Sequence, residues 1–215
     1  MAWVLRLVEH VGVIELALPP APRVLYVAAG AVSAGGTAGA LDAWTRIEAG
    51  NAWHATGPRA VTAPAGARVL HWELLRQPTP GTHGARVLLE HPIALDPRQP
   101  YLMRCDRVDF EPGGVALPHG HRGGGIRCLL EGALQVAVGE GAPRHVRPGE
   151  AWFESGREPV LARAAESGAT SFVRCSIQPR EIQGRSSIVY VDPADAARSR
   201  PRTYTVFVDD PIDLP

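Results

Sequence analysis

The sequence has no net charge and no long apolar run. Its 215 residues include 22 basic and 22 acidic residues, and the pI is about 7.1. A chain with equal numbers of acidic and basic residues lacks the excess of positive charge with which proteins bind nucleic acid or anionic membranes. No stretch reaches the length of a membrane span, and Glu9, His10 and Glu15 interrupt any apolar core of a signal peptide. We therefore expect a cytoplasmic protein with no nucleic-acid or membrane partner.

Cysteine is also scarce, and two common catalytic signatures are missing. Cys105, Cys128 and Cys175 are odd in number and widely spaced, which argues against a disulfide framework or a zinc cage. No serine lies in a G-x-S-x-G motif, which disfavours an α/β-hydrolase. The glycines at 123–125 are not followed by Gly-Lys-Ser/Thr, so they do not form a P-loop.

Glycine and proline, in contrast, are abundant. The chain has 23 Gly and 20 Pro, together about a fifth of its residues. This composition is typical of short strands joined by tight turns. No segment shows convincing helical periodicity, whereas apolar strand-like runs recur along the whole chain. The sequence therefore predicts an all-β protein.

The most informative segment runs from Gly113 to Gly132. It contains His119-Gly120-His121 in a predicted strand, followed by a glycine loop and a second strand. Residues i and i+2 of a strand point to the same side, so the two imidazoles should project together. Two neighbouring imidazoles can act as ligands of one divalent transition metal ion.

The same segment resembles the first motif of the cupin superfamily. In that motif five residues separate a Gly from His-x-His, and a Glu and a second Gly follow; Gly113, His119, His121 and Gly132 occupy matching positions. The Glu position holds Gly125. In the second motif, Gly149 and Gly156 match, but Glu154 replaces a Pro and Pro159 replaces the His ligand. The resemblance implies a double-stranded β-helix, or jelly-roll, barrel with half of the usual ligands.

The chain also repeats itself weakly at a spacing of about 100 residues. Residues 24–31 echo 126–133, and residues 50–57 echo 149–156. We therefore expect two cupin-type repeats, a bicupin with a degenerate first half that packs, braces or dimerises. The predicted domains are a degenerate barrel at 1–92, a barrel carrying the site at 93–180, and tail strands at 181–215 that cover a sheet edge.

Strand alternation also points Arg127 inward, close to the two histidines. An inward arginine is costly unless it is paired. It could hold a substrate carboxylate in a forked pair, or be satisfied by an internal acid such as Asp106 or Glu154. For a third metal ligand the nearby candidates are Glu154 and His145.

These residues lead to a preferred function and two alternatives. The resemblance implies a small-molecule enzyme similar to cupin-type metal-dependent dioxygenases. In it His119, His121 and Glu154 would bind Fe(II), with Zn, Mn or Ni as alternatives, and Arg127 would orient an anionic or polar substrate. The alternatives are a non-catalytic small-ligand-binding cupin that holds an anion on Arg127, and a metal-free isomerase or lyase that uses a histidine as general base. Cupins commonly pair through sheet edges, so we expect a homodimer.

The remaining aromatic and imidazole side chains receive structural interpretations. We expect the tryptophans to be core or rim aromatics, and the histidines of the first half to be surface or hydrogen-bonded residues. The residues concerned are Trp44, Trp53, Trp72 and Trp152, and His54, His71, His83 and His91.

Overall fold

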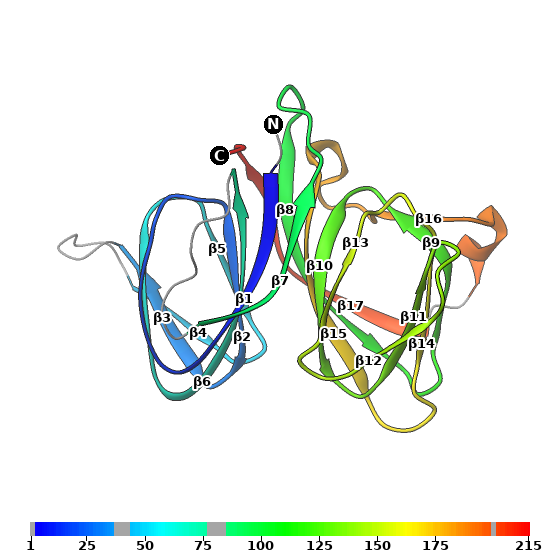
Figure 1. Cartoon of the computed structure of the whole chain (residues 1–215), viewed down its shortest axis with the longest axis horizontal. Helices are drawn as coiled ribbons and strands as arrows, with labels where there is room; N and C mark the ends of the chain where they lie inside the picture. The colour runs from blue at the N-terminus through cyan, green and yellow to red at the C-terminus, as the bar shows by residue number, and fades with distance from the viewer. Residues whose placement is uncertain (1–2, 37–43, 77–84, 199–200) are drawn as a thin grey trace. The chain divides into compact units, whose positions relative to one another are not determined.

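The computed structural model describes residues 3–36, 44–76, 85–198 and 201–215 (Figure 1). The described residues form seventeen β-strands and two short 3₁₀-helices, which confirms the prediction of an all-β protein. None of the helices among these residues is long and apolar enough to cross a membrane. The chain divides into two compact units, Met1–Pro100 with Ile212–Pro215, and Tyr101–Pro211.

The first unit contains one seven-stranded antiparallel sheet. Two long strands, β1 and β6, pair along most of their length, with an irregularity between Gly12 and Ile14. Because β6 also pairs with β2 and β3 at different points along its length, the sheet bends around an apolar core (Figure 1). The strands are β1 (Trp3–Leu18), β2 (Arg23–Ala29), β3 (Ala31–Gly35), β4 (Thr45–Glu48), β5 (Ala52–Ala55), β6 (Arg59–Leu75) and β7 (Ala85–Ile93).

The expected domain boundary between residues 92 and 93 lies inside β7. Pro92 is opposite Val4 of β1, and β7 has no strand on its other side among the described residues. An edge strand tolerates proline because its missing N–H is not needed for a second ladder. The proline-rich segment that follows belongs to the first unit, which continues to Pro100.

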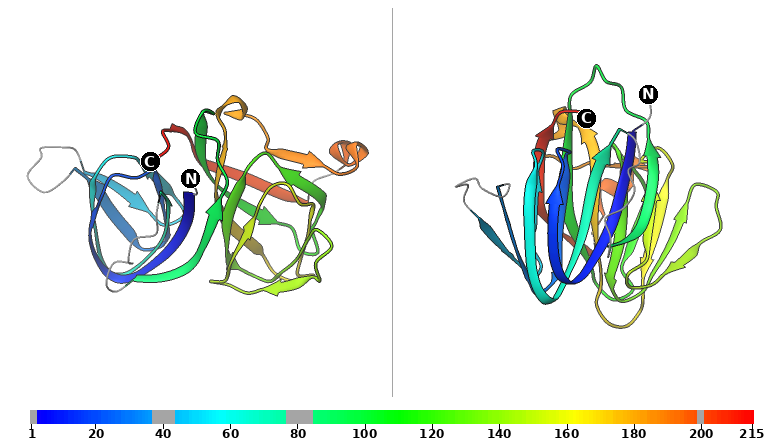
Figure 2. Two further views of the ribbon diagram at one scale, coloured as in Figure 1. Left: turned by 45° about the horizontal axis from the view of Figure 1, so that its top comes forward. Right: turned by 60° about the vertical axis from the view of Figure 1, so that its left-hand side comes forward.

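The second unit consists of two five-stranded sheets that face each other (Figures 1 and 2). One has the order β13-β10-β15-β8-β17 and the other β12-β11-β14-β9-β16. The strands are β8 (Tyr101–Phe110), β9 (Val115–His121), β10 (Gly124–Glu131), β11 (Leu134–Val138), β12 (Arg144–Val146), β13 (Ala151–Glu154), β14 (Val160–Ala164), β15 (Thr170–Pro179), β16 (Ile188–Tyr190) and β17 (Arg202–Ile212), with 3₁₀-helices η1 (Arg180–Ile182) and η2 (Pro193–Ala197).

An apolar core fills the space between these two sheets at one end of the unit. Leu129, Trp152 and Phe172 come from one sheet, and Val136 and Val160 come from the other. Among the described residues neither sheet closes on itself, because each ends in an edge strand on both sides. The tail supplies two of the edges: β16 pairs with β9, and β17 lies beside β8.

The segments that echo each other in sequence have matching strand pairings. The order β5-β2-β6-β1-β7 within the first unit has the same form as β13-β10-β15-β8-β17 in the second. The registers agree residue by residue. Matched pairs are Arg23–Ala55 with Gly125–Glu154, Val24–His54 with Ile126–Phe153, and Leu25–Trp53 with Arg127–Trp152.

Candidate functional site

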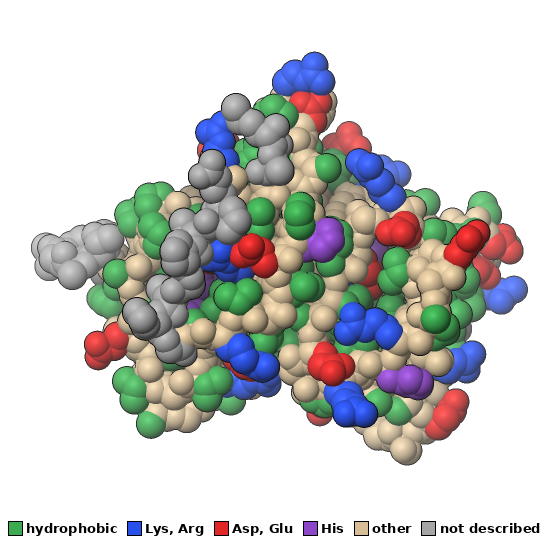
Figure 3. All heavy atoms as spheres, in the orientation of Figure 1, with side chains coloured by type: hydrophobic (Ala, Val, Ile, Leu, Met, Phe, Trp, Pro, Cys, Tyr) green, Lys and Arg blue, Asp and Glu red, His purple; other side chains and the backbone are tan. Residues whose placement is uncertain are grey.

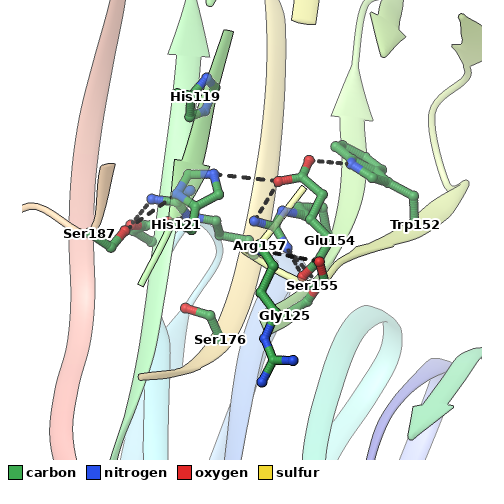
Figure 4. Close-up of polar contacts among 12 residues, drawn as sticks. His119, His121, Gly125, Trp152, Glu154, Ser155, Arg157, Ser176 and Ser187 are labelled. Carbon is green, nitrogen blue, oxygen red and sulfur yellow. Dashed lines mark hydrogen bonds and ion pairs between the residues drawn. The ribbon is translucent and has the colours of Figure 1, made fainter. Parts of the chain in front are cut away.

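His119 and His121 lie side by side in the interior of the second unit. Both are on β9 and are buried, at 5% and 8% exposure. Their ring centroids are 4.8 Å apart and the rings are nearly perpendicular. Figure 4 shows both rings rising from the same strand, with the Glu154 carboxylate between His121 and Trp152. The alternation that predicted neighbouring imidazoles thus brings them to one place.

Each imidazole has a defined hydrogen-bonding role. Nδ1–H of His119 donates to the carbonyl of Leu117 at 2.7 Å, which leaves Nε2 as the lone-pair nitrogen. Nε2 of His121 lies 3.4 Å from Oε2 of Glu154, and its Nδ1 lies 3.5 Å from the hydroxyl of Ser187. Burial lowers the pKa of His121 to about 3, and this outweighs the opposing hydrogen bond with Glu154. The neutral ring therefore donates from Nε2 and accepts from Ser187.

Glu154 is held by three donors rather than left open to a metal. Nη2 of Arg127 lies 2.7 Å from its Oε2, and Nε1–H of Trp152 donates to Oε1 at 2.8 Å. Burial alone would raise the pKa of Glu154, but the charge of Arg127 and the hydrogen bonds from His121 and Trp152 together lower it. The carboxylate is therefore ionised and fully engaged.

Arg127 is buried inside the sheet and does not reach a ligand pocket. Its side chain is 1% exposed, and Nη1 donates to the carbonyl of Gly125 at 2.6 Å. Arg127 lines neither the pocket of about 440 Å³ nor the void of about 20 Å³ in this unit. Of the two roles predicted for Arg127, its contacts are those of an internal ion pair with Glu154.

The cupin glutamate position is closed to any side chain. A Cβ atom on Gly125 would lie 2.5 Å from the carbonyl oxygen of Cys175 and 2.6 Å from Cβ of Ser176. At the position of the missing histidine, Pro159 is exposed and offers no donor atom. His145, the other candidate third ligand, is exposed on β12. Neither motif can therefore complete the usual set of ligands.

The residues present do not fit a metal centre. His119, His121 and Glu154 line a void of only about 20 Å³, which has room for about one water molecule. The only carboxylate that the described residues place there is neutralised by Arg127, and the charge of Arg174 also disfavours a cation. Among the described residues no group of three or more His, Cys, Asp or Glu side chains is arranged to hold a metal ion.

A second buried ion pair lies next to this network, and the sequence patterns did not predict it. Nε and Nη2 of Arg174 donate to the two carboxylate oxygens of Asp106 at 2.6 and 2.9 Å. Burial alone would lower the pKa of Arg174, but the Asp106 carboxylate more than offsets it and raises the pKa. The alternation argument that placed Arg127 inward also applies to Arg174, because the two lie opposite each other on β10 and β15.

Arg174 forms part of the wall of a pocket of about 440 Å³. A second forked pair, Arg104 with Asp209, lies in the same wall at 2.7 and 2.9 Å. Arg174 and Tyr204 also border the small void beside the histidines, so the two spaces are neighbours. The lining comprises Arg104, Asp106, Arg174, residues 184–188, Tyr204, Val206 and Asp209.

The other predicted side-chain roles have mixed outcomes. Trp152 belongs to the core as expected, and its indole also positions Glu154. His71 is buried rather than on the surface, at 3% exposure, and its Nε2 has no hydrogen-bond partner and lies 3.9 Å from Oε2 of Glu73. His83 lies outside the described residues. On the face shown in Figure 3, acidic and basic side chains are interspersed, as the balanced composition suggests.

No protein-family model matches the sequence, and no curated protein matches it significantly. Solved structures do resemble it. An oxalate decarboxylase variant from Bacillus subtilis is 12% identical over 90% of this chain and 73% of its own, with a TM-score of 0.62. A cupin 2 conserved barrel domain protein from Leptotrichia buccalis is 15% identical over 82% and 84%, with a TM-score of 0.53. An 11S allergen from Cocos nucifera is 13% identical over 88% and 82%, with a TM-score of 0.58. At these identities the likeness shows the fold alone, which is the cupin fold.

Proposed function

We propose that this cupin-fold protein binds a small organic acid in the Arg174 pocket and does so without a bound metal. The observation that carries the proposal is the buried, forked Arg174–Asp106 pair in the wall of a 440 Å³ pocket. A cavity of this size, with a few fixed polar groups among apolar ones, is typical of small-molecule sites. The ligand site is thus displaced from Arg127 to Arg174.

The pocket lining favours one negative charge on a partly apolar molecule. Three arginines and two aspartates line it, which leaves a formal charge of 3 − 2 = +1. The Asp106 fork occupies Nε and Nη2 of Arg174, while Nη1 takes part in none of the hydrogen bonds formed by described residues. A guanidinium held in this way is well placed to receive a carboxylate. Ile188, Tyr204 and Val206 supply apolar surface for the rest of the ligand.

The geometry favours binding over the two enzymatic alternatives. A metal-dependent oxygenase needs a donor set that these residues do not provide. A metal-free isomerase or lyase would need a general base, and His121 does contact Ser187 in the pocket wall. However, a pKa of about 3 makes His121 a weak proton acceptor, and general bases work best with a pKa near the working pH.

We also propose that the first half is a second cupin-type repeat, as the bicupin hypothesis holds. The residue-by-residue agreement between β2–β5 and β10–β13 supports a duplication. Leu25 stands at the register position of Arg127, and Arg23 at that of Gly125. The first repeat therefore lacks the buried guanidinium of the second at one position and carries another two residues earlier.

A panel of small carboxylates screened against the full chain tests the binding function. We expect at least one acid to raise the melting temperature saturably, with or without a chelator, because ligands that bind only the native state stabilise it. The double variant Arg174→Met/Asp106→Leu should lose this response while remaining folded, since removing both partners of a buried pair is tolerated better than removing one. Arg163→Met, on a solvent-exposed position of β14, is the matched control. An unchanged response in the double variant would overturn the assignment.

A further inference from the structure

Tyr204 separates the Arg174 pocket from the small void beside the histidines. Its side chain on β17 borders both spaces, and among the described residues Arg174 is the other one that does so. Tyr204 also packs against the apolar core between the two sheets. Because Asp106 fixes the Arg174 guanidinium, the Tyr204 ring is the part of this wall whose removal would join the two spaces.

The Tyr204 ring is held in place from two directions. Nε–H of Arg202 donates to the Tyr204 hydroxyl at 2.5 Å, and Nη2 of Arg202 lies 3.4 Å from the hydroxyl of Tyr190. The guanidinium carbons of Arg202 and Arg174 lie 5.7 and 5.8 Å from the centroid of the Tyr204 ring, within the range of cation–π contacts. The ring is therefore a fixed wall of the pocket.

Arg202 lies on the far side of this wall from the pocket. It is 8% exposed and borders the small void, but it is not among the residues that line the pocket. Its hydrogen bonds go to phenol oxygens, and no carboxylate of the described residues forms an ion pair with it. A guanidinium in this situation is a favourable partner for a carboxylate.

The charges on the two sides of the ring determine how many carboxylates a ligand can carry. The pocket lining has a formal charge of +1, which one carboxylate neutralises. A second carboxylate would remain unpaired in a partly apolar cavity, which is costly. Arg202 could pair with it, because Arg127 already neutralises Glu154, the carboxylate that the described residues place in the void. Burial lowers the pKa of His119 and His121, so their rings add no charge at neutral pH.

We propose that Tyr204 is the specificity-determining residue of the Arg174 pocket, because its ring covers Arg202 and so restricts the pocket to acids with one carboxylate. This inference rests on the function proposed above and names the class of its ligand, a monocarboxylic acid with a partly apolar body. An acid with two carboxylates would need Arg202 for its second charge, and the ring keeps it from reaching that residue.

Calorimetric titration of the full chain with matched pairs of acids at pH 7.5 and constant ionic strength tests the assignment. The pairs are butyrate with succinate and 3-phenylpropionate with phenylsuccinate, which differ in the second carboxylate. We expect the wild type to bind the monoacid of a pair about tenfold or more tightly than the diacid. Tyr204→Ala should remove or reverse this preference, because a diacid can then contact both Arg174 and Arg202. Tyr204→Ala/Arg202→Met should prefer the monoacid again.

Two further variants show whether the ring itself sets the preference. Tyr204→Phe keeps the ring and removes the hydroxyl, so it should retain the preference for the monoacid. Thr203→Ala, at an exposed position of the same strand, is the matched control and should bind as the wild type does. If Tyr204 were merely structural, its replacement by Ala would weaken both acids of a pair alike and leave the ratio of their affinities unchanged.

The outcomes separate this inference from the function on which it rests. A wild type that binds neither these acids nor any other carboxylate would overturn the binding function itself. A wild type that binds both acids of a pair equally, or a Tyr204→Ala protein that keeps the wild-type ratio, would overturn only the role of Tyr204. If Tyr204→Ala does not fold, Tyr204→Leu takes its place, and the ratio in the wild type still tests the proposal.

Discussion

The guanidinium of Arg127 lies 2.7 Å from the carboxylate of Glu154, and both side chains are almost completely buried. This pair occupies the centre at which the sequence suggested a metal site. It converts the carboxylate from a candidate ligand into the acceptor of an internal hydrogen-bond network. The paired histidines remain beside it as neutral members of the same network.

Removing one partner of this ion pair should destabilise the protein far more than removing both. Glu154→Gln leaves the Arg127 charge buried and unpaired, which should cost about 3–5 kcal/mol of unfolding free energy. Arg127→Met/Glu154→Leu should cost much less than the single change. Chemical denaturation gives both values, with the exposed Glu140→Gln as control. Equal losses in the single and double variants would contradict this account of the network.

The protein should bind transition metal only substoichiometrically. We expect untagged protein from metal-supplemented medium to contain little Fe, Mn, Zn or Ni by mass spectrometry, because Glu154 is engaged and the described residues place no third ligand. His119→Ala and His121→Ala should then leave the metal content unchanged. A stoichiometric metal that disappears in both variants would restore the metal-centre hypothesis.

Restoring the cupin glutamate should not restore a site. The Cβ of any residue at position 125 would lie 2.5 Å from the backbone oxygen of Cys175. Gly125→Ala should therefore cost about 1–3 kcal/mol, and Gly125→Glu at least as much, as measured by thermal unfolding. Gly57→Ala is the control, since among the described residues a Cβ atom there meets only the flexible end of Arg59, at 3.6 Å. A Gly125→Glu protein that melts at the wild-type temperature and binds metal would refute the prediction.

Acid should destabilise the first unit through its buried histidines. Burial lowers the pKa of His71 well below 6.5, and burial also lowers that of His10. Stability from a depressed histidine pKa is complete above the unfolded value and is lost as the pH falls below it. For His71 alone the slope should approach about 1.4 kcal/mol per pH unit below pH ~6.5. His71→Leu should flatten the stability–pH curve by that amount, whereas an unchanged slope would exclude His71 as its source.

Local alternation and spacing predicted the parts of the site that depend on one strand. The i, i+2 spacing placed His119 and His121 together, and the inward parity of Arg127 left a substrate carboxylate or an internal acid as its partner. The echo between residues 50–57 and 149–156 anticipated strands with the same partners in both halves. Each of these inferences needs only the period of a strand.

The features of the site that were not predicted depend on contacts between strands that are distant in the sequence. Gly125 is closed off by β15, which lies some fifty residues later in the chain. Arg174 of β15 and Asp106 of β8 lie opposite each other, and no sequence pattern within either strand predicts that they pair. His71 is buried because β1 and β2 flank it on both sides. Such pairings set burial and electrostatics but leave little trace in any short window of sequence.

The path of the backbone between the two units has a practical consequence. The chain leaves the first unit after Pro100, builds the second, and returns at Ile212–Pro215, where the carbonyl of Pro215 accepts from the Trp3 indole at 3.4 Å. A fragment that ends at residue 100 would therefore lack Ile212–Pro215, which belong to the same unit. To study the first unit alone, residues 212–215 should be attached to its end through a linker. An affinity tag after Pro215 would lie next to the contact with Trp3, so a tag is better placed elsewhere.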